Sequence, residues 1–150
     1  MNTAIRKATL QDLEPLSLLF DSYRVFYEKD SDLAGAKVFL KDRINNKESD
    51  IFVAIDATGN MTGFIQLYPI FSSTRMKRFT LLNDLFVHPS YRGQGISKAL
   101  LFEVQKFTKE TGSCGLMLET TKTNVIGNSL YPAVGFELDA EHNYYTWDTK

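Results

Sequence analysis

The sequence predicts an α/β fold with a mixed β-sheet, formed by one domain that spans residues 1–150. A length of 150 residues suits one domain and not two. Hydrophobic residues make up 43% of the chain and aromatic residues 13%, so there are enough large side chains to fill a core, and disorder is excluded. The hydrophobic period changes from helical to extended and back along the chain, which favours a sheet packed with helices.

Two helices are predicted before the first long strand. An amphipathic helix is expected at residues 9–28, where leucine and aromatic residues recur at spacings of three and four. Asp12 is a candidate N-cap, because Pro15 then falls in the first turn, where its missing N–H group costs little. Thr9 is the alternative cap and would place Pro15 in the helix interior. A shorter helix is predicted at residues 32–45.

Strands are predicted in the middle of the chain at residues 51–55, 61–70 and 79–87. A turn sequence at residues 56–60 separates the first two. Pro69 indicates that the far end of the second strand lies on an edge or leaves the sheet, since proline cannot donate to a ladder. Together these segments predict an antiparallel meander.

Helical and extended segments alternate in the last third of the chain. Apolar residues from Ile96 to Phe107 recur along one helical face. A short buried strand is predicted at residues 116–118, a short helix at residues 125–134 and a last strand at residues 144–147. With the two leading helices, about four helices would flank the sheet.

Composition disfavours several classes of protein. A formal charge of −1 and a pI near 6.1 argue against nucleic-acid binding, which needs clustered positive charge. No window approaches the roughly 18 apolar residues of a membrane span, so no membrane partner is expected. A charge stands where a signal peptide would need its apolar run, and a cytoplasmic location is predicted. With one cysteine, Cys114, and no cluster at ligand spacing, no metal is expected.

The most informative stretch, residues 82–101, is a strand, a turn broken by Pro89, and a loop with two glycines that leads into a helix. A helix N-terminus presents unpaired N–H groups and suits an anion such as a pyrophosphate. Gly93 and Gly95 would let the backbone approach phosphates, or they only make a tight turn; two glycines alone leave both alternatives open. A dinucleotide fingerprint would need a third glycine where Lys98 stands, and no P-loop sequence is present.

This stretch resembles the coenzyme A loop of the GNAT acetyltransferase superfamily, whose signature is Arg/Gln-x-x-Gly-x-Gly/Ala after an apolar-Val-x-Pro strand end. The matching residues are Phe86-Val87-His88-Pro89 and Arg92-Gly93-Gln94-Gly95-Ile96-Ser97, with Ser97 in place of Gly or Ala. Residues 124–136 are similar to the second signature, Asn-x-x-Ala-x-x-Leu/Phe-Tyr-x-x-x-Gly-Phe, with Gly127 at the alanine position. Residues 5–20 resemble the first strand and helix of the family, so the resemblance covers essentially the whole chain.

The resemblance implies a GNAT fold, a mostly antiparallel sheet with a splayed pair of parallel strands, and acetyl-CoA as the cosubstrate that enters the gap. Backbone groups of the splayed strand would pair with the pantetheine arm, and the glycine loop would hold the pyrophosphate. Asn124 would hydrogen-bond the pantetheine arm. The implied cosubstrate-binding residues are Leu85, Phe86, Val87, Arg92, Gly93, Gln94, Gly95, Ile96, Ser97, Lys98 and Asn124.

Two residues are implied in catalysis. Tyr131 would protonate the departing coenzyme A thiolate, and its place in the second signature favours this role over that of an ordinary core aromatic. Asp84 would take the proton of the attacking amine, directly or through water, and a structural carboxylate bonded to nearby backbone is an equal alternative. Residues 82–87 also resemble the strand of spermidine/spermine and histone/polyamine acetyltransferases, with Asn83 where those have Glu. Strand alternation would send Asn83 and Asp84 to opposite faces.

The acceptor site is implied at the first helix and the splayed strand, with Tyr27, Glu28 and Asn83 as substrate-binding residues. Aromatic rings and acids in this region suit a cationic amine, although they equally suit a buried aromatic stripe with a solvated acidic turn. Three basic residues within residues 71–78 suit an acidic group on the substrate or the phosphates of coenzyme A.

The sequence therefore predicts an acetyl-CoA-dependent N-acetyltransferase that acts on a primary amine by direct attack in a ternary complex. The amine would be a small molecule, a polyamine, an amino-acid derivative or a peptide amine. The alternative is a non-catalytic acyl-CoA sensor or interaction module. A homodimer stays open, because residues 143–147 would either supply an interface or complete the core.

Overall fold

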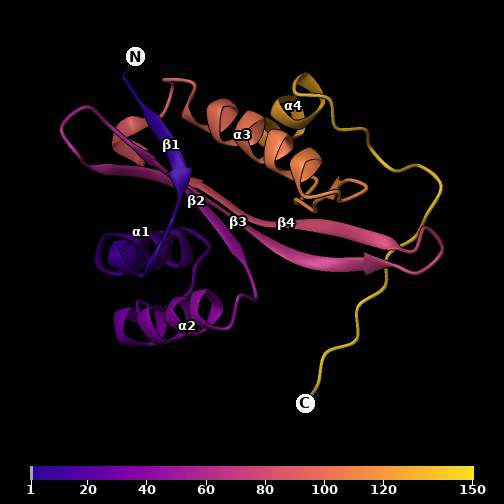
Figure 1. The fold of residues 1–150 in the computed structure, drawn as a ribbon, viewed down its shortest axis with the longest axis horizontal. Coiled ribbons are helices and arrows are strands. Elements are labelled where there is room, and N and C mark those ends of the chain that lie inside the picture. Colours follow the sequence, from indigo (N-terminus) through magenta and orange to yellow (C-terminus); the bar gives the residue numbers. More distant parts are fainter. Residues whose placement is uncertain (1) are drawn as a thin grey trace. The chain divides into compact units, whose positions relative to one another are not determined.

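The computed structural model describes residues 2–150 and divides the chain into two units, residues up to Glu119 and residues Thr120–Lys150. Within the described residues, the first unit holds a five-stranded sheet in the order β1-β2-β3-β4-β5 (Figure 1). Its strands are β1 (Ala4–Lys7), β2 (Asp50–Ile55), β3 (Met61–Ser72), β4 (Lys77–Val87) and β5 (Leu116–Met117). Neighbours from β1 to β4 are antiparallel, and β5 runs parallel to β4. The predicted mixed sheet is confirmed, whereas the single domain stays a prediction.

The α-helices described in the first unit cover both faces of the sheet. They are α1 (Leu13–Phe26), α2 (Leu33–Asn45) and α3 (Ile96–Glu110), and short 3-10 helices at Leu10–Asp12 and Pro89–Tyr91 precede α1 and follow β4. Helices α1 and α2 lie on one face and α3 on the other (Figure 1). Alternate residues of β2 follow this division, because Val53 joins the core cluster of α1 and α2, whereas Phe52 packs on Phe107 of α3 with ring centroids 5.0 Å apart.

The far end of β3 lies on an edge, as Pro69 predicted. The pairing of β2 with β3 ends at Leu67, whereas β3 and β4 continue as a two-stranded hairpin to Ser72 and Lys77. Pro69 therefore has no β2 neighbour, and an edge does not require the N–H group that proline lacks.

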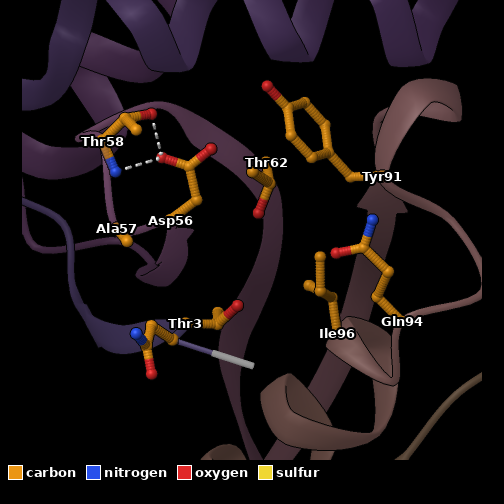
Figure 2. A pocket seen from close by; sticks show the side chains of 9 residues that line it. Thr3, Asp56, Ala57, Thr58, Thr62, Tyr91, Gln94 and Ile96 are labelled. Atoms are coloured by element: carbon orange, nitrogen blue, oxygen red, sulfur yellow. Dashed lines mark hydrogen bonds between the residues drawn. The ribbon is translucent and has the colours of Figure 1, made fainter.

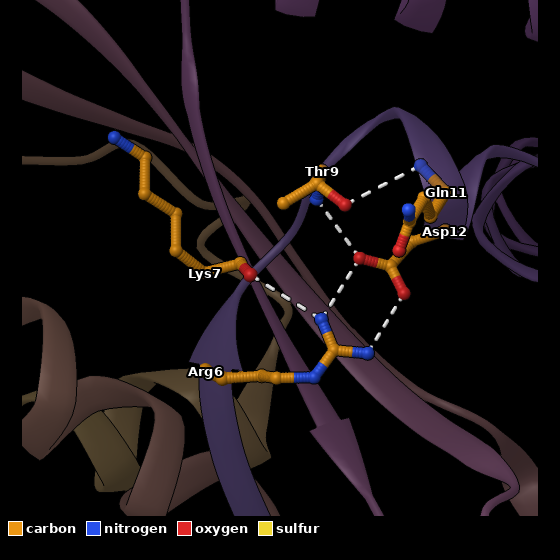
Figure 3. Close-up of polar contacts among 5 residues, drawn as sticks. All are labelled: Arg6, Lys7, Thr9, Gln11 and Asp12. Carbon is orange, nitrogen blue, oxygen red and sulfur yellow. Dashed lines mark hydrogen bonds and ion pairs between the residues drawn. The ribbon is translucent and has the colours of Figure 1, made fainter.

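A buried carboxylate holds the start of α1 (Figure 3). Asp12 accepts two hydrogen bonds from the Arg6 guanidinium, each at 2.8 Å, and one from the Thr9 N–H at 2.8 Å. In return the Thr9 hydroxyl accepts the Gln11 N–H. Thr9 thus caps the 3-10 turn and Asp12 precedes α1, which leaves Pro15 in the first turn of α1. The Arg6 hydrogen bonds hold the pKa of the Asp12 carboxyl below its usual value.

In the second unit, α4 (Val125–Ala133) confirms the helix predicted at residues 125–134. The Asn124 side chain caps this helix, because its oxygen accepts the Gly127 N–H at 3.0 Å. The helix therefore begins at the asparagine that opens the second signature.

The last strand, predicted at residues 144–147, is wrong, because residues 137–150 form neither helix nor strand in the structure. The three aromatic side chains of this segment are between 68% and 89% exposed. Asp139 instead bends the chain by accepting the Glu141 N–H and the Tyr144 hydroxyl, and these bonds, the first above all, lower its pKa to about 2. Aromatic and β-branched residues favour a strand, but a strand also needs a neighbour for its backbone groups.

We expect Asp12→Asn to lower the free energy of unfolding by about 1 to 2 kcal/mol, because it removes a charge-assisted bond whose Arg6 side is half exposed. The folded-state pKa of Asp12 is lowered. Its stabilisation is therefore present above the unfolded pKa of about 3.9 and is lost as the pH falls through the folded value. Urea unfolding of both proteins from about pH 7 to about pH 3 should show the difference shrinking toward acid.

The exposed Asp148 provides the control. Asp148→Asn should leave the unfolding free energy within about 0.5 kcal/mol of the wild type. An equal loss in both variants, or a difference that does not change with pH, would contradict the role given to Asp12.

Candidate active site

Strand β4 has neighbours on both sides over only part of its length. Strand β3 pairs with it from Lys77 to Val87, whereas β5 pairs only with Thr80 and Leu81. Residues 82–87 therefore have an open edge within the described chain. This edge is the splayed part of the parallel strand pair that the sequence predicts.

Leu85 and Val87 turn their backbone groups toward the open edge. The His88 N–H donates to the Thr62 carbonyl at 2.8 Å, and in an antiparallel pair every second residue repeats this exchange. The backbone groups of Phe86 consequently face β3, and those of Leu85 and Val87 face the edge. Leu85 and the Val87 N–H can thus bind an extended ligand through the backbone, whereas the Phe86 side chain is buried in the core.

An irregularity in β4 sets the surroundings of Asp84. The pairing with β3 passes from Leu82 to Asp84 and skips Asn83, as in a β-bulge. Asp84 is buried, and its two oxygens accept hydrogen bonds from the Gln66 amide at 2.8 Å and the Asn83 amide at 3.2 Å. Asn83 and Asp84 are therefore in contact. Asn83 is exposed whereas Asp84 is buried, and the irregularity in β4 still lets their side chains meet.

Gln66 and Tyr68 lie on the same sheet face as Asp84, the face that α1 and α2 cover. They follow Phe64 of that core by two and four residues, and such residues of a strand share a face. Gln66 is fully buried, and its Oε1 has no hydrogen-bond partner among residues 2–150. Burial, together with the charge of Asp84, raises the pKa of Tyr68 to about 12 against an opposing effect of Arg43. Tyr68 keeps its proton at neutral pH and cannot serve as a base there.

The loop after β4 leads directly into α3. The His88 imidazole accepts the Ser90 N–H at 3.1 Å, which gives it a turn role. Gly93 and Gly95 have φ angles of +79° and +77°, a region that favours glycine. Gly95 is the N-cap of α3, and among residues 2–150 no side-chain hydrogen bond caps the helix, so its first N–H groups are available to an anion. A Cβ at either glycine would meet nothing within 4 Å, so the space beside the loop is open.

The other loop residues predicted to bind the cosubstrate differ in whether they can offer it a backbone group or a side chain. Ile96 is buried in the core, so it can offer a ligand only its N–H. Ser97 is half-buried, and Gln94 and Lys98 are exposed. A lysine near the helix start can add positive charge to that of the backbone N–H groups.

The Arg92 side chain ties the loop to both β4 and α1. Its Nε–H donates to the Val87 carbonyl at 3.0 Å. Its guanidinium carbon lies 4.8 Å from the ring centroid of Phe26 and 5.5 Å from that of Phe86, which are cation–π distances. Part of the positive charge expected for phosphate binding is therefore engaged with aromatic rings.

Aromatic contacts link the predicted acceptor residues to β4. Tyr27 packs on Tyr23 and Phe26, with centroids 5.1 and 5.3 Å away. Tyr23 and Phe26 each pack on Phe86, at 5.6 and 5.9 Å. Glu28 is exposed just beyond α1 with a φ of +64°. The structure thus connects Tyr27 to the splayed strand through other rings, and Glu28 follows it in the chain.

A cavity of about 250 Å³ adjoins the glycine loop (Figure 2). It is lined by Asn2, Thr3, Asp56, Ala57, Thr58, Thr62, Tyr91, Gln94 and Ile96. The Asp56 carboxylate already accepts the N–H groups of Thr58 and Asn60. The lining includes no residue of the open edge of β4, so this cavity does not mark the place where the strand would bind a ligand.

Asn124 and Tyr131 belong to the second unit. The Asn124 amide nitrogen donates to the Thr120 hydroxyl at 2.8 Å while its oxygen caps α4. Tyr131 is half-buried, and its ring packs on Phe136 with centroids 5.8 Å apart. The pantetheine contact of Asn124 and the proton transfer by Tyr131 stay predictions.

Comparison with known proteins identifies the family. Residues 14–136 match the model of the acetyltransferase (GNAT) family. The chain belongs to the GNAT acetyltransferase family. An uncharacterized N-acetyltransferase of Bacillus subtilis is 43% identical over 141 residues, which cover 94% of each chain.

Two further comparisons agree with this assignment. A crystal structure described as a probable acetyltransferase superposes with a TM-score of 0.94 at 34% identity and covers 98% of each chain. A spermidine N(1)-acetyltransferase of Thermoplasma acidophilum is 26% identical and covers 93% of this chain and 91% of its own. The GNAT protein is thus an enzyme of the N-acetyltransferase class, as predicted, and the family uses acetyl-CoA as cosubstrate.

The residues present fit acetyl-CoA at two points. The open edge of β4 offers backbone groups to an amide-containing arm, and the uncapped start of α3 offers N–H groups to a pyrophosphate. Among residues 2–150, no helix is long and apolar enough to cross a membrane. The same residues contain no group of three His, Cys, Asp or Glu side chains placed to hold a metal ion.

Sequence reasoning missed Gln66 and the contacts of the Arg92 side chain. A signal for Gln66 was present, because an amide stands between Ile65 and Leu67 in an otherwise apolar strand. A buried polar group needs a hydrogen-bond partner, and here that partner is Asp84. The Arg92 contacts had no comparable signal, because Phe26 is distant in the sequence.

We expect Gly95→Ala to raise the Kd for acetyl-CoA on the order of tenfold, because its Cβ would enter the open space beside the first N–H groups of α3. Gly112 lies just past the other end of α3, has a φ of +74° and also faces open space. Gly112→Ala therefore carries a similar backbone strain and should leave this Kd unchanged. Isothermal titration of both variants measures the difference, and equal affinities would contradict an anion site at Gly95.

Proposed function

We propose that the protein transfers the acetyl group of acetyl-CoA to a primary amine by direct attack in a ternary complex. One observation carries the proposal: half of β4 combines an open backbone edge at Leu85 and Val87 with a buried carboxylate at Asp84. The edge would hold the thioester arm, and the carboxylate would receive the amine. Both functions thus come from neighbouring residues of one strand.

Asp84 and Gln66 form a pair of acceptors that suits an amine. Gln66 Oε1 is buried without a partner among the described residues, and each Asp84 oxygen has capacity beyond the one amide bond that it accepts. No lysine or arginine within residues 2–150 forms an ion pair with Asp84, so an incoming ammonium would supply the missing counter-charge. Because an alkylammonium has a reference pKa of ~10.4, it must lose a proton before it attacks, and Asp84 takes that proton directly or through water.

The thioester side is assigned to backbone groups, and Tyr131 and Asn124 are given the roles that the second signature implies. Bound acetyl-CoA supplies the thioester carbonyl that the amine attacks. An N–H at Leu85 or Val87 stabilises the developing oxyanion. Tyr131 donates its phenolic proton to the departing sulfur, and Asn124 binds the pantetheine arm. The backbone of residues 92–98 holds the pyrophosphate.

Tyr27, Glu28 and Asn83 are proposed to contact the acceptor. Asn83 donates to Asp84 and so places its amide beside the carboxylate. Tyr27 and Glu28 lie at the end of α1, whose rings pack on the splayed strand. This arrangement suits a small amine or the amine of a peptide, and one relative acts on spermidine according to its name.

We expect Asp84→Asn to lower kcat about 100-fold or more, because a positioned general base contributes roughly 10²- to 10⁴-fold. The side chain keeps its size, so the Kd for acetyl-CoA should stay close to that of the wild type. Steady-state release of free coenzyme A thiol measures kcat. Asp50→Asn, at the start of β2 where Asp50 pairs with Lys7, is the matched control and should keep its turnover.

Tyr131→Phe tests the proton donor. The variant should lose most of kcat while its affinity for acetyl-CoA changes little, because only the phenolic hydroxyl that carries the proton is removed. Turnover equal to that of the wild type would refute the role of Tyr131 as the acid.

A panel of amines tests the function itself. Thiol release should rise above background hydrolysis with at least one acceptor among small amines, polyamines, amino-acid derivatives and peptide N-termini. If none stimulates release although acetyl-CoA binds, the non-catalytic acyl-CoA-binding alternative replaces the proposal.

A further inference from the structure

Gln66 carries a buried oxygen that has no hydrogen-bond partner. Its side chain is fully buried on β3, and Oε1 accepts no hydrogen bond from residues 2–150. The amide nitrogen donates to Oδ2 of Asp84 at 2.8 Å. Because an ionised carboxylate can only accept, the nitrogen has to face Asp84, and Oε1 is turned away from it and left unpaired. An unpaired buried oxygen destabilises a fold, so this orientation needs a reason other than packing.

The strand register brings Gln66 and Asp84 together. The two residues are direct partners in the antiparallel β3–β4 pair, next to the bulge that skips Asn83. Directly opposite residues of neighbouring strands have Cβ atoms about 4.5 to 5.5 Å apart on the same face of the sheet. A glutamine side chain is long enough to reach a carboxylate across this distance. The contact is therefore fixed by the backbones of both strands.

Of the two amides that donate to Asp84, the Gln66 amide is the one held by packing. Phe64, two residues earlier on the same strand face, is also fully buried, and its ring centroid lies 5.9 Å from that of Phe20. Asn83 is exposed, and its bond to Asp84 is longer, at 3.2 Å. Packing locks the rotamer of a buried side chain, whereas an exposed side chain changes rotamer freely. Gln66 is therefore the donor that can fix the direction of the carboxylate.

We propose that Gln66 is a positioning residue for acetyl transfer. Its amide holds Oδ2 of Asp84, so the free lone pairs of the carboxylate keep one direction, in which the acceptor amine meets them. This role rests on the proposed function, because Gln66 acts through the base assigned to Asp84. An apolar side chain at this position would leave no oxygen unpaired, but it would also leave the carboxylate free to rotate.

Two substitutions remove the amide donor. Gln66→Met keeps the length of the side chain and suits an apolar core, and Gln66→Leu differs from it in shape. Each should lower kcat on the order of tenfold, because a base that is not held is less often in the reactive geometry. The Kd for acetyl-CoA should stay unchanged, since the open edge of β4 and the start of α3 are not altered. Thiol release with spermidine, benzylamine and triglycine as acceptors measures kcat, and isothermal titration measures the Kd.

A double-mutant cycle separates positioning from a purely structural effect. In an Asp84→Asn background no carboxylate is left to hold, so adding Gln66→Met should change the remaining kcat by less than about twofold. The same loss in both backgrounds would overturn the proposal, because Gln66 would then act independently of Asp84.

Ser17→Ala is the matched control. Ser17 Oγ is also buried without a partner among the described residues, but the hydrogen bonds to Asp84 come from other side chains. The control should keep the turnover of the wild type. A loss equal to that of Gln66→Met would overturn the proposal, because kcat would then respond to the removal of any buried polar group. Urea unfolding shows whether each variant is folded.

The positioning role and the proposed function fail in different ways. If the wild type releases no thiol above background with any of the amines, the proposed function fails and the positioning role fails with it. If Asp84→Asn lowers kcat whereas both Gln66 variants match the wild type, only the positioning role fails.

Discussion

The one-sided pairing of β4 is the constraint on which the proposed chemistry depends. Strand β3 pairs with β4 along its whole length, whereas β5 pairs with β4 at Thr80 and Leu81 only. Unpaired backbone groups at a strand edge are available for pairing with an extended ligand. An extended cosubstrate arm with amide groups can form such a pairing. The position of the proposed anion site follows, because the same strand runs into the loop that starts α3.

The proposed chemistry also depends on the burial of the Asp84 carboxylate. A buried carboxylate is expensive unless hydrogen bonds or a counter-charge stabilise it. The amides of Gln66 and Asn83 supply neutral donors, and no basic side chain of the described residues pairs with Asp84. Its charge is strong enough to contribute, after burial, to raising the pKa of Tyr68 to about 12. The proposed acceptor site therefore holds a carboxylate without a basic partner among the described residues, which suits the cationic amine that we propose as acceptor.

Patterns among residues close together in the sequence predicted the elements that depend on nearby residues alone. Spacing of apolar residues gave the helices, Pro69 gave the edge of β3, and the two glycines gave a loop whose φ angles are positive. Non-local features escaped prediction. The bulge at Asn83 depends on the register between two strands, and alternation within one strand cannot reveal it. The strand expected at residues 144–147 failed for a similar reason, because side-chain propensity cannot supply a neighbouring strand.

The Arg92 side chain contacts both parts of the proposed site, the open edge of β4 and the end of α1. Its Nε–H holds the carbonyl of Val87 at the end of the open edge, and its guanidinium packs on Phe26 at the end of α1 and on Phe86 of β4. The loop proposed to bind the pyrophosphate also begins at Arg92. The same side chain therefore contacts both the strand that would bind the cosubstrate and the end of α1 that would meet the acceptor. Preorganisation of this kind reduces the ordering that binding must impose. The Arg92 charge thus serves the geometry of the proposed site. The anion site proposed at the start of α3 uses backbone N–H groups, so it does not require an excess of basic residues in a chain whose net charge is −1.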